Sequence, residues 1–110
     1  MKAYDFYKKA LLRLHLEKFE EKLCDSALEF MNEIAADLKI GEIKTLNCEL
    51  ELSTELKEGF LSGLVMLLSL AVGDTQQNSL YTELYNAKRA KILSVCESVE
   101  DRLPTCEGGI

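Results

Sequence analysis

Acidic side chains recur at every fourth position along one stretch of the sequence, and their spacing is the first feature that suggests chemistry. Carboxylates in pairs can bind metal ions or transfer protons. Residues four apart drift around a helix by about 40° per step, because one turn takes 3.6 residues. Such a row cannot close into one compact metal cage, and no Glu-x-x-His motif accompanies it to suggest a di-iron bundle. The row consists of Glu21, Asp25, Glu29, Glu33 and Asp37.

The same row has two further interpretations, a solvated helix face and a protein-interaction surface, and the sequence leaves both open. Adjacent like charges at this spacing destabilise a helix by roughly 0.2–0.5 kcal/mol per pair. A positively charged partner would remove that cost. The cations that could supply it, from the same subunit or from a neighbour, are Lys8, Lys9, Arg13, Lys88, Arg89 and Lys91.

Cysteine and histidine, the other residue types that bind metals or attack substrates, are scattered. The chain has four cysteines and one histidine, and no two cysteines form a Cys-x-x-Cys pair. The first residues lack the apolar region of a signal peptide, so we expect reduced thiols in a cytosolic setting. We find no nucleophile or orienting residue that would make His15 a general base. The sequence therefore predicts a protein that is not an enzyme and that binds no metal and no cofactor.

The charge of the chain also argues against nucleic acids and membranes as partners. The formal net charge is −6, whereas contacts to phosphates and to anionic lipid surfaces need Lys and Arg. Gly59 and Gly63 fall within a helical pattern, so they cannot form a phosphate-binding loop. The basic residues near position 90 are interleaved with acidic ones, unlike a DNA-recognition helix. We expect neither sequence-specific nucleic-acid binding nor membrane binding.

Charge is distributed unevenly along the chain. Residues 1–20 carry a net charge of +2, and residues 21–60 carry −6. Unlike surfaces of this kind suit head-to-tail contact between molecules. Two helices that are merely solvated differently would produce the same numbers, so both interpretations stay open.

An uncharged stretch between Gly59 and Gly73 is the strongest indication of the fold. A helix that is apolar on every side must be buried on every side. At about 13 residues it is too short to span a bilayer, which takes roughly 20. The rest of a small soluble protein must then wrap around it. Gly59 and Gly63 each cost about 1 kcal/mol in a helix relative to alanine, which suggests a packing notch for the first or last helix.

Apolar residues at helical spacing predict three further helices. In the last of these, Leu80 and Leu84 belong to the predicted core stripe, and Tyr81 and Tyr85 flank it. We therefore expect a mainly α, four-helix bundle-like single domain over residues 1–110. The predicted helices span about residues 3–17, 20–39, 54–72 and 79–102, with a flexible tail over 104–110.

Certain residues mark where these helices should begin and end. Gly41 is a plausible stop for the second helix. Ser53 or Thr54 can cap the start of the third helix, and Asn78 or Ser79 can cap the start of the fourth.

One short segment changes period. Apolar and polar residues alternate over residues 46–52, which is typical of a half-buried strand within an extended segment at about 43–52. A single strand cannot satisfy its own backbone, so it should pair with Ile43 and its neighbours, pair with another subunit, or form an extended arm. A local hairpin or a loop laid on the helices is the alternative. The apolar positions, which are candidate interaction residues, are Leu46, Cys48, Leu50 and Leu52.

Two segments near the start of the chain carry a resemblance. The first runs from Asp5 to Leu14 and loosely resembles the pattern ALR-L, and the second runs from Ser26 to Ile34 and loosely resembles AL--LN--L. A helix of small and apolar residues and a long final helix with tyrosines follow. Over about residues 3–100 the chain resembles the head-to-tail adaptors, or tail accessory factors, of short-tailed bacteriophages. It departs from them at residues 59–63, which replace a more alanine-rich run.

The resemblance implies a structural component of a phage virion or prophage. Family members bind the portal ring as a ring of copies and extend the DNA channel toward the tail, without catalysis. The partners would be the portal protein or neighbouring subunits, in the host cytoplasm or in the virion. The alternative prediction is a small cytosolic helical module that binds or regulates another protein. An adaptor should assemble around a ring, whereas a regulator should stop at a monomer or dimer.

Overall fold

The computed structural model describes residues 1–98 of the chain, and the side chains of residues 1–94. The described residues form four α-helices and one turn of 3-10 helix. The elements are α1 (Ala3–Leu14), η1 (Glu17–Phe19), α2 (Glu20–Asp37), α3 (Thr54–Ala71) and α4 (Thr75–Ser98). The predicted mainly helical, bundle-like fold is confirmed. The predicted end of the last helix near residue 102 and the predicted flexible tail at 104–110 lie outside the described residues.

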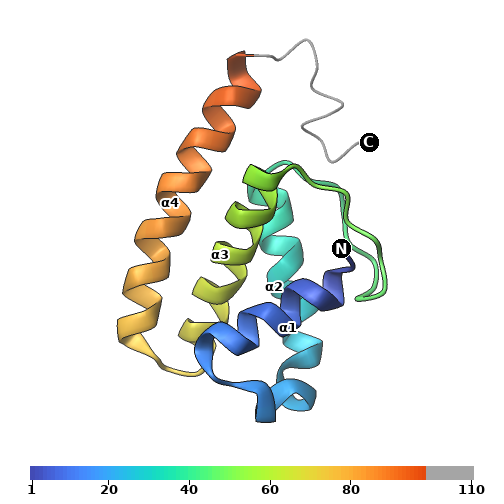
Figure 1. The fold of residues 1–110 in the computed structure, drawn as a ribbon, viewed down its shortest axis with the longest axis vertical. Coiled ribbons are helices and arrows are strands. Elements are labelled where there is room, and N and C mark those ends of the chain that lie inside the picture. Colours follow the sequence, from blue (N-terminus) through green and yellow to red (C-terminus); the bar gives the residue numbers. More distant parts are fainter. Residues whose placement is uncertain (99–110) are drawn as a thin grey trace.

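The uncharged helix α3 is the centre of the fold. It packs against α1, α2 and α4, whereas α4 packs mainly against α3 (Figure 1). Phe60, Leu64 and Leu68 of α3 are fully buried. The ring of Phe60 meets the ring of Phe6 of α1 edge to face, with 5.0 Å between the ring centres. This edge-to-face geometry is one that aromatic pairs prefer.

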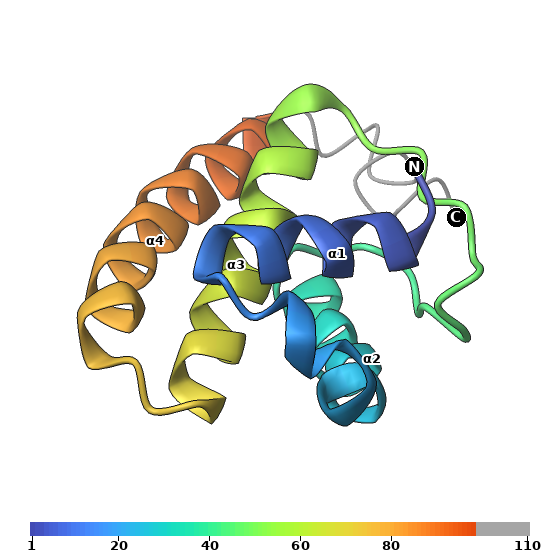
Figure 2. The same cartoon turned by 60° about the horizontal axis from the view of Figure 1, so that its bottom comes forward.

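The prediction that this helix is buried on every side is wrong at its C-terminal end. Leu70 is 64% exposed and Val72 is 41% exposed. In Figure 2 the last turn of α3 extends below α1 before the chain turns into α4. One side of this turn stays buried, since Leu68 and Ser69 are fully buried, so the burial argument holds around the middle of α3 and for only one side of its end.

The first two helices end earlier than predicted. α1 ends at Leu14 because His15 adopts a left-handed conformation, with φ of 57°, and its backbone N–H bonds back into the helix. α2 ends at Asp37, and the left-handed residue is Lys39, with φ of 62°, rather than Gly41. Since only one residue needs to turn the chain, Gly41 is not required for the stop.

The predicted cap of α3 is confirmed, and the predicted cap of α4 is wrong. The Ser53 hydroxyl accepts a hydrogen bond from the Leu56 amide at 3.3 Å. α4 begins at Thr75 because a carboxylate oxygen of Asp74 accepts the Gln77 amide at 3.1 Å. Asn78 is already inside α4, where its side chain donates to the carbonyl of residue 66 at 2.9 Å.

The two glycines of α3 form the predicted notch, and the last helix occupies it. A Cβ atom on Gly59 would lie 2.6 Å from Cδ1 of Ile92 of α4. A Cβ atom on Gly63 would lie 2.8 Å from the ring of Tyr85 of α4 and 2.7 Å from Cδ1 of Ile34 of α2. The absence of side chains at these two positions therefore lets α4 and α2 both approach α3 closely.

The segment between α2 and α3 is partly extended, as predicted, but it forms no strand in the described part of the chain. The chain turns at Thr45, whose carbonyl accepts the Cys48 amide at 3.2 Å. After the turn a single antiparallel bridge joins Glu49 to Lys2. The Ala3 amide donates to the carbonyl of Cys48 at 2.9 Å. The pairing partner is thus the N-terminal segment of the same chain, which the sequence did not indicate.

Asn32 of α2 fixes this connecting segment to the helical body. Its Oδ1 accepts the Ile43 amide at 2.8 Å, and its Nδ2 donates to the Ile43 carbonyl at 2.9 Å. The side chain of Ile43 is 2% exposed, so these backbone groups could not easily turn to water instead. Asn32 is the asparagine of the AL--LN--L pattern, and its role here is structural.

Candidate interaction faces

Four of the five predicted carboxylates form an acidic face on the outer side of α2. They lie opposite the buried residues Ala27, Met31 and Ile34, which pack into the core. Each of the four is exposed, and within residues 1–98 none of them makes an ion pair or a side-chain hydrogen bond. The acidic face is defined by Glu21, Asp25, Glu29 and Glu33.

The fifth carboxylate, Asp37, leaves this face and joins α2 to α4. Its Oδ2 lies 2.6 Å from Nε of Arg89 and also accepts a hydrogen bond from the hydroxyl of Tyr85. Burial alone would raise the pKa of Asp37, but the hydrogen bonds from Arg89 and Tyr85 and the charge of Arg89 hold it below the ordinary value. The drift of about 40° per step turns the end of the row by roughly half a circle. That drift brings Asp37 round to α4.

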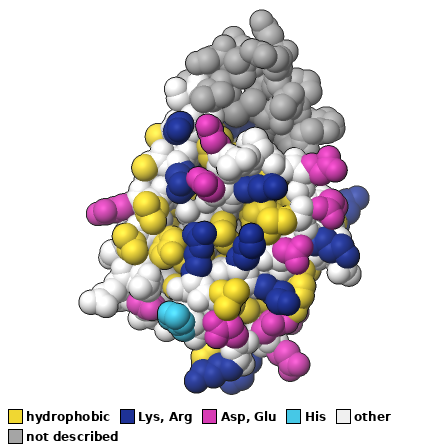
Figure 3. Space-filling view, viewed as in Figure 1, with side chains coloured by type: hydrophobic (Ala, Val, Ile, Leu, Met, Phe, Trp, Pro, Cys, Tyr) yellow, Lys and Arg dark blue, Asp and Glu magenta, His cyan; other side chains and the backbone are white. Residues whose placement is uncertain are grey.

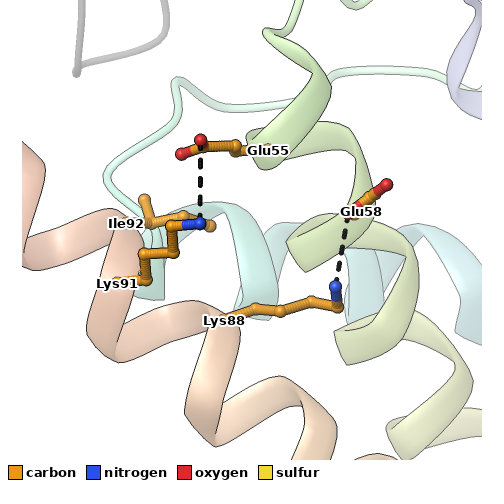
Figure 4. A pocket seen from close by; sticks show the side chains of 5 residues that line it. All are labelled: Glu55, Glu58, Lys88, Lys91 and Ile92. Atoms are coloured by element: carbon orange, nitrogen blue, oxygen red, sulfur yellow. Dashed lines mark hydrogen bonds and ion pairs between the residues drawn. The ribbon is translucent and has the colours of Figure 1, made fainter.

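The other two cations of α4 are paired with α3 across a shallow hollow. Nζ of Lys88 lies 3.3 Å from a carboxylate oxygen of Glu58, and Nζ of Lys91 lies 4.0 Å from one of Glu55 (Figure 4). Ile92 forms the apolar part of the hollow. Exposed pairs of this kind contribute about 0–1 kcal/mol each. The basic patch predicted on this helix is therefore used largely within the chain.

A basic face lies on the outer side of α1. It consists of Lys8, Lys9 and Arg13, which are exposed and form no ion pair within the described part of the chain. Lys8 instead lies over the ring of Tyr4, with 5.6 Å from its Nζ to the ring centre. Leu12, on the same outer side of α1, is 59% exposed. Figure 3 looks onto this side of the molecule and shows basic side chains gathered over its middle, with hydrophobic side chains between them.

The first half of α4 is turned differently from the prediction, because two of its predicted core residues lie on the outer side. Leu80 is 50% exposed and Leu84 is 40% exposed, whereas Tyr85 is only 4% exposed. Tyr81 is half-buried against the core. Hydrophobic side chains accordingly gather along the left edge of the molecule in Figure 3, over α4. Counting back one heptad from Ile92 reaches Tyr85, and this spacing could have identified the buried side.

The candidate residues of the extended segment face the core of their own chain. Leu50 is buried, and Leu46, Cys48 and Leu52 are half-buried against the hydrophobic core. Because the N-terminal residues already bond to this segment, one edge of its backbone in residues 46–50 is occupied within the chain. Of the alternatives left open by the sequence, the described structure agrees best with a loop laid on the helices, bonded to the N-terminal residues instead of to Ile43.

The residues best suited to catalysis or metal binding are not brought together in residues 1–98. No group of three or more His, Cys, Asp and Glu side chains there could hold a metal ion. Hydrogen bonds from the backbone and side chain of Thr45, and from the backbone of Lys44, lower the pKa of the Cys48 thiol. His15 is an exposed residue at the end of α1, and Cys106 lies outside the described residues.

Two further observations concern all of the described residues. None of the four helices there has the length and apolar character needed to cross a bilayer. Every buried side-chain nitrogen and oxygen there has a hydrogen-bond partner. Within the described residues no buried side-chain polar atom is therefore left unpaired for a ligand.

Comparison with known proteins finds no matching protein-family model, no matching curated protein and no matching solved structure.

Proposed function

We propose that this chain is a structural protein of a phage or prophage, a head-to-tail adaptor that assembles on a portal ring and extends the DNA channel. The observation that carries the proposal is the pair of unlike faces on one small helical body. The acidic face of α2 and the basic face of α1 both point outward and have no ion-pair partner in residues 1–98. Surfaces of opposite charge determine the partner and the orientation in which proteins associate.

The order of the elements agrees with the resemblance seen in the sequence. An extended connection precedes the apolar helix α3, and a short turn then leads into the long helix α4, which carries Tyr81 and Tyr85. Asn32, part of the AL--LN--L pattern, has a defined role in holding the connection to α2. These features support the resemblance because they concern the order and connection of the helices and not only the amino-acid composition.

The test is to recover the protein with its partners from its native host after prophage induction. The affinity tag belongs at the C-terminus, because residues 1–3 bond to residues 48–50 and an N-terminal tag would disturb that contact. We expect mass spectrometry to identify a portal protein together with other capsid components. A variant with the acidic face reversed, Asp25→Lys with Glu29→Lys, serves as the matched control and should lose these partners.

The alternative, a cytosolic helical module that regulates one protein, predicts a different result. Recovery of a single host regulator or enzyme at the same yield from repeated purifications, with no capsid protein, would rule out the adaptor. The same result would establish the regulatory module.

A further inference from the structure

Among the described residues, charged side chains of both signs remain on the surface without an ion-pair partner. Of the cations that sequence analysis paired with the acidic row, Arg89 binds Asp37, and Lys88 and Lys91 bind carboxylates of α3. The basic face of α1 and the acidic face of α2 are what is left over. Three cations on α1 and four carboxylates on α2 form no ion pair among the described residues. Each helix also exposes one side chain of the opposite sign, Asp5 on α1 and Lys22 on α2.

These two faces cannot meet within one molecule. α1 and α2 both pack on α3 through their buried sides, which include Phe6 on α1 and Met31 on α2. Their outer sides therefore point into solvent in different directions (Figure 2). A second copy of the chain can present the face that the first copy lacks.

The basic face is shorter than the acidic face, so it can dock along part of it. The acidic face spans 12 residue steps from Glu21 to Glu33, or about 18 Å at 1.5 Å per residue. The basic face spans five steps, or about 7.5 Å, so it covers a little less than half of the acidic face. Leu12, 59% exposed on the same side as the cations, adds apolar surface that such a contact would remove from water.

We propose that the basic face of α1 docks onto the acidic face of α2 in a second copy of this chain. Because the two faces differ, the contact is heterologous, and repeating it produces a closed ring or an open chain of subunits. The inference deepens the proposed function by naming the partner of these faces. It rests on the proposed function only for the role of the assembly in a virion, because the contact between two copies needs no portal protein.

Charge reversal in trans tests this docking. One variant reverses α1 (Lys8→Glu, Lys9→Glu and Arg13→Glu), and the other reverses α2 (Asp25→Lys, Glu29→Lys and Glu33→Lys). Sedimentation velocity at low salt should show the wild type associating as its concentration rises, with the association lost in high salt. Each variant alone should associate at least about tenfold more weakly. An equimolar mixture should regain association, because each variant carries the face that complements the reversed face of the other.

Several results would overturn the inference. Wild-type protein that stays monomeric at low salt up to millimolar concentration would do so, as would variants that associate as well as wild type or a mixture that fails to recover. Far-UV circular dichroism of each variant verifies folding, and a milder variant with a single reversal on the same face, Lys9→Glu or Glu29→Lys, replaces any that misfolds. Portal recovery is a separate readout. Self-association of the purified protein, with no portal protein recovered from the host, would sink the proposed function alone. Portal capture by a chain that never self-associates would sink the inference alone.

Discussion

Nε of Arg89 lies 2.6 Å from Oδ2 of Asp37, so the last residue of α2 is joined to the second half of α4. The same carboxylate accepts the hydroxyl of Tyr85, whose side chain is only 4% exposed. α4 otherwise packs mainly against α3. The carboxylate of Asp37 therefore gives α4 a second attachment to the body of the protein.

Replacing Asp37 by alanine should lower the free energy of unfolding by about 1–3 kcal/mol, because the buried hydroxyl of Tyr85 then loses its acceptor. Urea unfolding followed by far-UV circular dichroism measures the change. Glu33→Ala is the matched control, since Glu33 is exposed on the same helix and contacts no partner. It should change the free energy by less than about 0.5 kcal/mol. Equal effects of the two substitutions would show that the contact with α4 contributes nothing.

The stabilisation by Asp37 should depend on pH in one direction. The folded protein holds the pKa of Asp37 below 3.8, so folding favours the charged carboxylate. Its contribution is complete above that pH and is lost as the pH falls through the lower folded pKa. The difference in unfolding free energy between wild type and Asp37→Asn should therefore be constant from pH 7 to about pH 5 and should shrink in more acidic solution. A difference that grows toward acid would contradict the assignment.

The central helix is the part of the fold that sequence reasoning predicted best. Absence of charge from residue 59 to residue 73 identified its buried middle, and Ser53 identified its start. Gly59 and Gly63 indicated a close approach by another helix because glycine costs about 1 kcal/mol in a helix interior relative to alanine. These signals lie within the helix itself, so they can be read from its own residues without knowing how the rest of the chain folds.

The orientation of α4 could not be predicted in the same way. Two helical stripes compete there, one through Leu80 and Leu84 and one through Tyr81 and Tyr85, and hydrophobicity alone favours the leucines. The structure buries Tyr85 instead, because the ring fits the space above Gly63 and its hydroxyl reaches Asp37. Both reasons are tertiary contacts between residues more than 20 positions apart, which periodicity does not reveal.

The candidate faces show the same limit. From spacing alone, Asp37 was one of five equivalent carboxylates. In the structure, helical drift turns it toward α4, where its ion pair with Arg89 joins α2 to α4. Likewise, the alternating pattern at residues 46–52 correctly separated buried from exposed side chains, since Leu50 is buried between two exposed glutamates. It could not identify the N-terminal residues as the pairing partner, because alternation shows which side chains face the core and not which segment supplies the backbone hydrogen bonds.

Asn32→Ala should detach the connecting segment from α2. The substitution removes the donor and the acceptor that pair with the backbone of Ile43, and we expect a loss of about 2–3 kcal/mol in unfolding free energy. Asn47→Ala is the matched control, since Asn47 is exposed in the same segment and should cost less than about 0.5 kcal/mol. Amide hydrogen exchange provides a local readout. The Ile43 amide should exchange faster in the Asn32 variant, and unchanged protection there would refute the role of Asn32 in holding the segment to α2.

The two glycines of α3 should respond differently to alanine. At Gly63 the new methyl group would meet Cδ1 of Ile34 at 2.7 Å and the ring of Tyr85 at 2.8 Å. Overpacking of this kind costs about 1–3 kcal/mol, which outweighs the gain of about 1 kcal/mol in helix propensity. At Gly59 the close atom is the end of the flexible Ile92 side chain, and the next neighbours lie 3.8 Å and 3.9 Å away. Gly59→Ala should therefore leave the unfolding free energy within about 1 kcal/mol of wild type.

A double-mutant cycle separates crowding at Gly63 from other causes. Ile34→Val removes the Cδ1 atom that the new methyl group would meet, so Gly63→Ala should cost about 1 kcal/mol less in that background than in wild type. Urea unfolding of the four proteins gives the coupling energy. The contact with Tyr85 persists in the double variant, so part of the cost should remain. Strictly additive costs would mean that the methyl group does not press on Ile34, and the close approach of α2 to α3 at this glycine would then be wrong.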